Sequence, residues 1–477
     1  MNKNNLSTIL ICASPLLFNV ACKTAEEPGP MNILYIFSDD LNDWTSVMGG
    51  HPQAKTPNIE RLAAMGVTFM NAHCPSPACG PARASILTGF YPPKTGVLGN
   101  ADNFRDNPGT ADAITLPQYF SAHGYHTIAA GKVFHHPRGA GDEPSPYSDD
   151  ISWDEHWRGQ VGTKAPNPFP EQPLDIPTDD YFGRAFVWGP SPETTEETFD
   201  YQLSKFIADF VNQEHEKPFL AAAGIFRPHL SWFVPQEFFD MFPLDEIILP
   251  KVYENDLDDI PDVGLGFIKP LVQDELVRKD LWKEAVRAYL ANIAFADHCI
   301  GVLLDAIEAS DYKDNTIIVL MGDHGWHLGE KKHWSKFTLW ERATRTTFMM
   351  HVPGMVAGQK CNAPVNLIDL YPTLVDLCGL PPKNDLEGNS LRPLLEDPDA
   401  NWPHVALTYY QHPHNYSIRD ESWRYIHYHD GTEELYYHPD DPHEWHNVID
   451  NPRSGDIIRE LRRRSGLGEN HRLFITN

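Results

Sequence analysis

The sequence predicts an α/β protein with a mostly parallel sheet between helices and a smaller C-terminal subdomain built on an antiparallel sheet. Three observations lead to this fold class. Apolar runs of strand length recur along the first 380 residues and alternate with segments of helical periodicity. Several of these runs end in charged or histidine side chains. Near residue 381 the composition shifts to Pro, Asn, Asp and Gly, and alternating Tyr, Trp and His patterns follow.

The predicted strands are short apolar runs, which suit strands that are buried on both faces of a sheet. In chain order they are 32–37, 67–69, 126–131, 219–223, 316–321 and 348–352. Four of them lead into polar residues, namely Asp39-Asp40, Lys132, His229 and Asp323-His324. Because parallel strands present their carboxyl ends at one edge, where α/β sheets bind ligands, we expect these side chains to converge.

Helical periodicity marks the connecting segments. The first helix is expected to have Thr56 as its N-cap, Pro57 in its first turn and Gly66 at its end. Apolar residues recur at helical spacing in 199–211 and again over the longer segment 281–307. These helices would cover the faces of the sheet.

The chain is expected to divide into three parts. Residues 1–30 form an export signal and linker, 31–380 a catalytic domain, and 381–477 the C-terminal subdomain. Within the last part, 423–428 alternates as a strand does, and a closing helix is expected near 457–464.

Composition argues against polyanionic partners. The 38 Lys and Arg against 66 Asp and Glu give a net charge of −28. Such a balance argues against nucleic acid and against an anionic membrane surface. An anionic substrate would therefore need a local cluster of cations.

The N-terminus has the features of an export signal. Lys3 precedes the apolar run 6–20, which is too short to span a bilayer, and Ala21 precedes Cys22. We expect an exported protein, either a periplasmic or cell-surface lipoprotein lipidated on Cys22 or a protein secreted after cleavage at Ala21. If Cys22 is lipidated, the protein would contact the membrane through this lipid anchor.

The remaining cysteines lack zinc-type spacing. An exported protein can form disulfides, so a bridge between Cys361 and Cys378 is one option.

Acidic residues at two strand ends point to a metal site. Adjacent carboxylates such as Asp39 and Asp40 are costly to bury unless a cation binds them. With Asp323 and His324 they form an oxygen-rich ligand set, which favours Ca²⁺ and, less strongly, Mg²⁺. The alternative is that these residues cap helices or lie on solvated loops.

One segment carries a specific motif. Cys79-Gly80-Pro81-Ala82-Arg83 is followed by Thr88-Gly89. This pattern resembles the signature of the type I sulfatases, Cys-x-Pro-x-Arg followed by Thr-Gly. Cys74 lacks the Pro and Arg at the corresponding positions, so Cys79 is the residue that matches.

The resemblance implies a sulfatase, or alkaline-phosphatase-like, fold and a chemistry. In the family a separate maturation enzyme converts the signature cysteine to formylglycine. One hydroxyl of the hydrated aldehyde attacks sulfur, and the second then expels sulfate. For this chain the nucleophile would be residue 79, which would also lie beside the metal.

Roles for the neighbouring residues follow from the same resemblance. Arg83 would hold the hydrate, and Lys132 and Lys336 would neutralise the sulfate. His229 would protonate the leaving oxygen, and His135 would deprotonate the hydrate. Two alternatives stay open: His136 in place of His135, and a solvated basic loop around Lys336. The C-terminal histidines line a substrate pocket or lie on the surface; they are His412, His414, His427 and His429.

Three local features resemble the iduronate-2-sulfatase branch of the family. They are Gly131-Lys132-Val133-Phe134-His135, Arg227-Pro228-His229 and Asp323-His324-Gly325-Trp326. They imply a 2-O-sulfated uronic acid of a glycosaminoglycan as substrate, within the wider class of sulfated saccharides. The alternatives are another sulfated glycan such as an algal one, a phosphonate or phosphate ester hydrolase of the same superfamily, and a silent glycan-binding protein in which Cys79 stays a thiol.

Overall fold

The computed structural model describes residues 30–135, 149–157 and 186–468 of the 477-residue chain. Within this part of the chain an eight-stranded sheet forms the centre of the molecule. Its strands, in spatial order, are β12 (Gln359–Asn366), β2 (Val67–His73), β11 (Phe348–His351), β8 (Thr316–Gly322), β1 (Asn32–Ser38), β6 (Phe219–Ile225), β3 (His126–Gly131) and β4 (Glu155–Trp157).

The sheet is mostly parallel, as the sequence predicts. Strands β8, β1, β6, β3 and β4 run parallel to one another, whereas β11 runs antiparallel to both of its neighbours. In the register, Ser38 pairs with both Gly322 and Ile225, so β1, β8 and β6 end at the same level. The polar residues that follow these strands therefore start from one edge.

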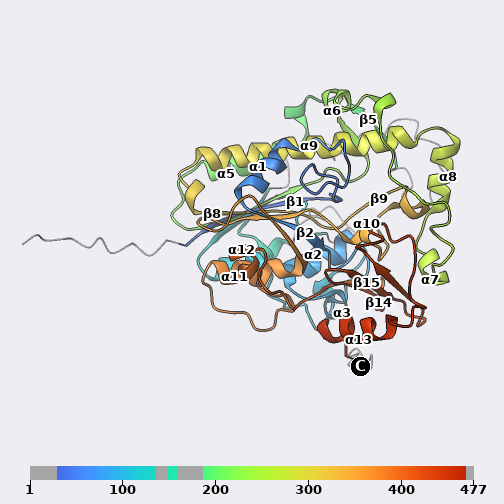
Figure 1. Cartoon of the computed structure of the whole chain (residues 1–477). Coiled ribbons are helices and arrows are strands. Elements are labelled where there is room, and N and C mark those ends of the chain that lie inside the picture. The colour runs from blue at the N-terminus through green and yellow to red at the C-terminus, as the bar shows by residue number, and fades with distance from the viewer. Residues whose placement is uncertain (1–29, 136–148, 158–185, 469–477) are drawn as a thin grey trace, which may run out of the picture.

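Helices cover both faces of the sheet (Figure 1). Alternate side chains of β1 point to opposite faces: Leu34 and Ile36 pack with one apolar core, while Tyr35 and Phe37 pack with the other. The first face carries α1 (Pro57–Met65), α5 (Phe199–Val211), α6 (Gln236–Asp240), α8 (Pro270–Arg278) and α9 (Trp282–Ala309). The second carries α2 (Cys79–Thr88), α4 (Leu116–Ala122), α11 (Leu370–Leu377) and α12 (Arg392–Glu396). Shorter helices are α3 (Pro92–Thr95), α7 (Asp262–Leu265) and α10 (Glu341–Thr344).

Helix α9 is the long helix expected over 281–307. It is long and apolar enough to cross a membrane, yet most of it is buried within the protein. Burial against the sheet explains its apolar composition, so we interpret it as a core helix.

The start of α1 differs from the expectation. Thr56 occupies the N-cap position, but its side chain makes no capping bond and instead contacts Ser46. The free N–H groups of Asn58 and Ile59 donate to the carboxylate of Asp297, a residue of α9, at 3.1 and 2.8 Å. A neighbouring helix thus supplies the anion that a helix N-terminus favours.

A second sheet follows the helices that close the first domain. Its antiparallel strands are β13 (Ala406–Tyr410), β14 (His412–Arg419), β15 (Trp423–His427) and β16 (Glu433–Tyr437), in that order. The closing helix α13 (Ser454–Arg464) packs on one face, where Ile458 and Leu461 join the apolar core (Figure 1). Two further two-stranded ribbons pair β5 (Trp188–Ser191) with β7 (Trp232–Pro235) and β9 (His327–Leu328) with β10 (Trp334–Ser335).

The domain boundary near residue 380 stays a prediction. Leu391, Leu394, Leu395 and Trp402 lie beyond it but pack into the core of the main sheet. The expected alternative of a disulfide between Cys361 and Cys378 is wrong in this structure, since both thiols are free. Cys361 is buried within β12, whereas Cys378 follows the end of α11.

Candidate active site

The polar residues at the carboxyl ends of four strands meet in one buried cluster. Asp39 and Asp40 follow β1, Lys132 follows β3, and Asp323 and His324 follow β8. The fourth strand, β6, leads to His229. The convergence expected from the sequence is therefore present, and the N-terminus of α2 brings Cys79 to the same place.

Three carboxylates form the acidic part of the cluster. Oxygen atoms of Asp39, Asp40 and Asp323 all lie within 4.8 Å of one another, and all three side chains are buried. The backbone N–H of Asp40 donates to Oδ1 of Asp323 at 3.0 Å. Asp40 has a φ of 63°, a left-handed conformation that is uncommon for a residue other than glycine. Such local strain is typical of functional sites.

Cys79 lies against this acidic group. Its Sγ is 3.3 Å from Nε2 of His324, 3.0 Å from Nζ of Lys336 and 3.9 Å from Oδ1 of Asp40. The Nδ1 of His324 lies 3.1 Å from the carbonyl of Gly325, to which it can only donate. This bond leaves the lone pair of Nε2 directed at the cluster, as a metal ligand requires.

Two lysines bring positive charge to the same cluster. Lys132 forms a close ion pair with Asp39, and Nζ of Lys336 lies 2.6 Å from Oδ1 of Asp40. Glycine is required on β6 beside the end of β3, because a Cβ at Gly224 would come within 2.3 Å of the backbone of Lys132. The absence of a side chain at Gly224 therefore lets the backbone of Lys132 pack directly against β6.

Arg83 contacts the acids of the cluster. Its guanidinium pairs with Asp39 at 3.1 Å and with Asp323 at 2.9 Å, and it also donates to the carbonyls of Lys132 and Val133. These contacts indicate that Arg83 orients two carboxylates. The role expected from the sequence, in which Arg83 holds the hydrate at residue 79, stays a prediction.

Lys336 is buried although Lys332 of the same loop is exposed, so the alternative in which Lys336 lies on a solvated basic loop is wrong. Only 1% of the Lys336 side chain is exposed, and Lys331 on the same loop pairs with Asp256 at 2.6 Å. Ser335 and Phe337, on either side of Lys336, have φ values of 100° and 77°. Unusual backbone conformations on both sides of Lys336 indicate that the surrounding packing fixes this lysine in place.

His229 and His135 are the partly exposed histidines of the site. Nε2 of His229 lies 4.0 Å from Asp39 and 3.9 Å from Asp40, and 28% of its side chain is exposed. Its Nδ1 lies against the carbonyl of Leu230. Burial lowers the pKa of both histidines well below the usual value, although the carboxylate of Asp39 opposes this shift. His136, the alternative to His135, lies outside the described residues, as does Cys22.

The electrostatics of the cluster favour a bound cation. Burial raises the pKa of Asp40 to about 7, with further contributions from Asp39 and Asp323, even though Lys336 opposes the shift. Oδ2 of Asp40 is buried and has no hydrogen-bond partner. A buried, unsatisfied carboxylate oxygen amid two other acids fits the ligand set of a divalent cation. Burial also raises the pKa of the Cys79 thiol, which is therefore a poor nucleophile as it stands.

A buried ion network outside the cluster was not foreseen from the sequence. Arg424 of β15 lies 2.5 Å from Glu341 and 2.6 Å from Glu444, and Glu444 also accepts from the backbone of Glu341. Lys331 donates to the carbonyl of Glu444. The network thus ties the C-terminal sheet to the segment that carries Lys336. Its members come from distant parts of the chain and share no local motif.

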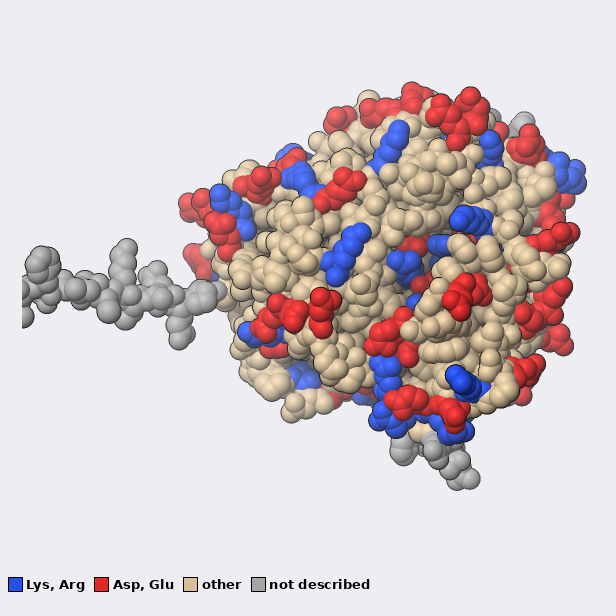
Figure 2. Space-filling model, in the orientation of Figure 1, with Lys and Arg blue, Asp and Glu red and all other residues tan. Residues whose placement is uncertain are grey.

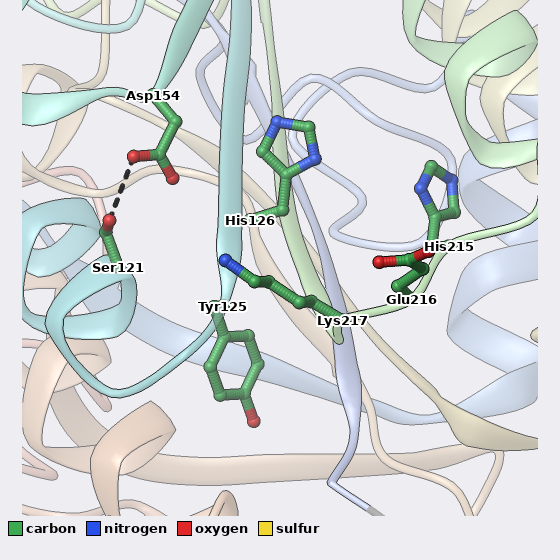
Figure 3. A pocket seen from close by; sticks show the side chains of 7 residues that line it. All are labelled: Ser121, Tyr125, His126, Asp154, His215, Glu216 and Lys217. Carbon is green, nitrogen blue, oxygen red and sulfur yellow. Dashed lines mark hydrogen bonds between the residues drawn. The ribbon is translucent and has the colours of Figure 1, made fainter.

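Two hollows lie at opposite edges of the sheet. One, of about 400 Å³, is lined by Ala78, Leu98, Gly99, Asn100, Val263, Gly266, Phe267, Lys269, Phe337, Tyr410 and Gln411. Since Ala78 and Phe337 are the neighbours of Cys79 and Lys336, this hollow adjoins the cluster. The other, of about 410 Å³, includes Ser121, His126, Asp154 and Lys217 (Figure 3). His126 begins β3 and Lys217 precedes β6, so it lies at the opposite, amino-terminal edge.

Three of the four C-terminal histidines lie close together, and none of the four is among the described residues that line the first hollow. The ring centroids of His412 and His414 are 5.3 Å apart, as are those of His412 and His429. His412 directly follows Gln411, a lining residue.

The sequence of this chain matches family models and is similar to several known proteins. The Sulfatase family model matches residues 31–380, and a model for the C-terminal part of N-sulphoglucosamine sulphohydrolase matches residues 329–468. A "Sulfatase" of Formosa agariphila is 37% identical over 93% of this chain and 89% of its own length. Mouse iduronate 2-sulfatase is 28% identical over 91% of this chain and 93% of its own length.

Structural similarity extends beyond sulfatases. The phosphonate monoester hydrolase of Agrobacterium radiobacter has a TM-score of 0.73 and 20% identity, over 91% of this chain and 96% of its own. At this identity the likeness concerns the fold, which therefore does not by itself decide which ester is cleaved.

Proposed function

The chain belongs to the sulfatase family, and we propose that it removes sulfate from a sulfated saccharide through a formylglycine formed from Cys79. The observation that carries this proposal is the placement of Cys79 within one buried cluster with three carboxylates, His324 and Lys336. The motif around Cys79 is the one that the maturation enzyme of type I sulfatases modifies, so we propose that enzyme as a partner. When formed, formylglycine supplies a hydrated aldehyde with two hydroxyls at this position.

We propose that Asp39, Asp40, Asp323 and His324 hold Ca²⁺, with Mg²⁺ less favoured. Carboxylate oxygens dominate this set, and oxygen ligands suit both ions. A bound divalent cation would polarise a sulfate oxygen and lower the pKa of a neighbouring hydroxyl. Arg83 would keep Asp39 and Asp323 oriented toward it through the contacts described above.

Proton transfers fall to the two partly exposed histidines. In the free site burial favours neutral imidazoles, but an anionic sulfate next to His229 would favour its protonated form. Protonated His229 can donate to the sugar oxygen as the S–O bond breaks, while His135 can accept a proton from the nucleophile. Lys132 and Lys336 would neutralise the sulfate oxygens throughout.

For the substrate we propose a 2-O-sulfated uronic acid of a glycosaminoglycan. The proposal rests on the segments 131–135, 227–229 and 323–326, and on the similarity to a relative named iduronate 2-sulfatase. We further propose that the protein is exported, with Cys22 as the site of a lipid anchor. That proposal rests on the sequence of residues 1–30, which lie outside the described part of the chain.

The direct test measures sulfate release. The protein, produced together with a formylglycine-generating enzyme, is incubated with an aryl sulfate, an aryl phosphate diester and defined sulfated saccharides. We expect higher kcat/KM on sulfate esters than on the diester, and release of sulfate from at least one saccharide. The Cys79→Ala variant should fold but release no sulfate, because the nucleophile is missing.

Two results would overturn the proposal. A preference for the phosphate diester would identify a phosphate or phosphonate ester hydrolase. An unmodified thiol at Cys79 in protein made with the maturation enzyme, seen by mass spectrometry of the peptide and accompanied by no turnover, would identify a silent binding protein.

A further inference from the structure

The hollow beside Cys79 is formed by residues that no sequence motif brings together. Asn100 follows the N-terminal helices, Phe267 and Lys269 lie between α7 and α8, and Tyr410 ends β13. The wall is thus built by the main domain and by the C-terminal sheet. Its volume of about 400 Å³ is in the range of pockets for small ligands.

Backbone contacts join this hollow to the candidate active site. The N–H of Gly80, the residue after Cys79, donates to Oδ1 of Asn100 at 2.8 Å. The N–H of Phe337, the residue after Lys336, donates to the carbonyl of Pro77 at 3.1 Å. Two of the residues that line the hollow, Ala78 and Phe337, are the immediate chain neighbours of Cys79 and Lys336.

Aromatic rings form one side of the hollow. The centroids of Phe267 and Tyr410 are 5.0 Å apart, and those of Phe337 and Tyr410 are 6.1 Å apart with nearly parallel planes. Gln411 donates to the hydroxyl of Tyr410 at 2.9 Å. Apolar ring faces with a few polar groups beside them are the usual lining of a small-molecule site.

The charge of the hollow contrasts with the rest of the protein. Asp and Glu side chains are spread around much of the outline of the face seen in Figure 2, in keeping with the net charge of −28. Among the described residues that line the hollow, by contrast, no acid occurs and Lys269 is the one charged residue. Its backbone N–H donates at 3.0 Å to Nδ1 of His333, whose Nε2 lies 2.7 Å from the carbonyl of Lys336. The backbone of Lys269 is thereby fixed relative to the backbone of Lys336.

We propose that this hollow binds the sugar that carries the reacting sulfate, with its ring against Phe267, Phe337 and Tyr410, and that Lys269 pairs with a second anionic group of the saccharide. The proposal rests on the proposed function and adds to it a residue that selects for acidic saccharides. The second anion is either a uronate carboxylate or a sulfate on the neighbouring sugar.

The test compares wild type and Lys269→Gln on three saccharides. The first carries the 2-O-sulfated uronic acid next to a sulfated hexosamine, the second has its uronate carboxyl reduced to an alcohol, and the third lacks the hexosamine sulfate. For the first saccharide we expect the variant to lose about 10- to 100-fold in kcat/KM, since one charged hydrogen bond is removed. The loss should vanish on whichever saccharide lacks the anion that Lys269 binds.

Matched variants separate this effect from misfolding. Lys313→Gln changes an exposed lysine at the amino-terminal edge of the sheet and should leave all three rates unchanged. Lys269→Met keeps the aliphatic stem and should show the same selectivity if the Gln variant folds poorly.

The outcomes are distinct. Equal losses on all three saccharides, or no loss on any, would overturn the assignment of Lys269 even if the protein is an active sulfatase. Wild-type protein that cleaves aryl sulfates but none of the saccharides would instead overturn the proposed function.

Discussion

Replacing Arg424 with Met should destabilise the folded protein strongly. The Arg424 side chain is fully buried and lies 2.5 Å from Glu341 and 2.6 Å from Glu444. Methionine fills similar volume but leaves both carboxylates without their central cation. Breaking a buried ion pair in this way typically costs about 3–5 kcal/mol. Because Arg419 and His438 still contact these acids at 3.3 and 2.9 Å, we expect a loss near the lower value.

The same variant has a defined pH dependence. Burial on its own would raise the pKa of Glu341, but His438, Arg419 and Arg424 hold it well below the ordinary value of 4.5. The pKa of Glu444 is lowered in the same way by Arg424 and His438. A carboxyl with a lowered folded-state pKa contributes stability above pH 4.5, and this is lost as the pH falls through the folded-state pKa. The difference in the free energy of unfolding between wild type and variant should therefore narrow as the pH falls below about 4.5.

The assay is urea denaturation of both proteins at pH 7 and at several values below 5. Arg459→Met provides the control, since Arg459 on α13 is 61% exposed and its pair with Asp456 should contribute little. An Arg424→Met variant as stable as wild type at pH 7, or a difference that widens toward low pH, would refute the reasoning.

Three further substitutions test other parts of the account. Asp40→Asn should weaken calcium binding, measured by calorimetry, by more than the roughly 10- to 100-fold typical of losing an outer-shell partner, and unchanged affinity would exclude Asp40 as a ligand. His229→Gln should slow the hydrolysis of saccharide sulfates by about 10²–10⁴-fold but that of aryl sulfates far less, because an aryl leaving group needs little protonation. Equal slowing of both reactions would contradict the role of His229 as the general acid. Asp297→Ala removes the cap of α1 and should lower the free energy of unfolding, measured by denaturation, by about 1–2 kcal/mol. Asp305→Ala on the same helix should lower it much less, because Asp305 forms an exposed ion pair. Equal effects of the two substitutions would argue against the cap.

The features predicted from the sequence are those with a local signal. A buried parallel strand has a short apolar run, and parallel strands end at one edge, so the meeting of Asp39, Asp40 and Asp323 follows from two separate segments. The motif from Cys79 to Arg83 is likewise contiguous. The sequence also indicated the antiparallel C-terminal sheet through the alternation in 423–428.

The features that were missed depend on side chains from distant elements. Thr56 has the right residue type for an N-cap, yet Asp297 of α9 takes that role because α9 crosses α1 at its start. Arg424 reaches Glu341 across 83 positions of sequence, and no residue pattern marks such a pair. The contacts of Arg83 with Asp39 and Asp323 were missed for the same reason, since they depend on where two other strands end.

The most direct measurement is a crystal structure of the enzyme matured with the formylglycine-generating enzyme and grown with calcium. We expect an ion bound by Asp39, Asp40, Asp323 and His324, with an oxygenated carbon of residue 79 beside it. An intact thiol at residue 79 in active enzyme would contradict the account, and so would carboxylates neutralised by Lys132 and Lys336 with no ion between them.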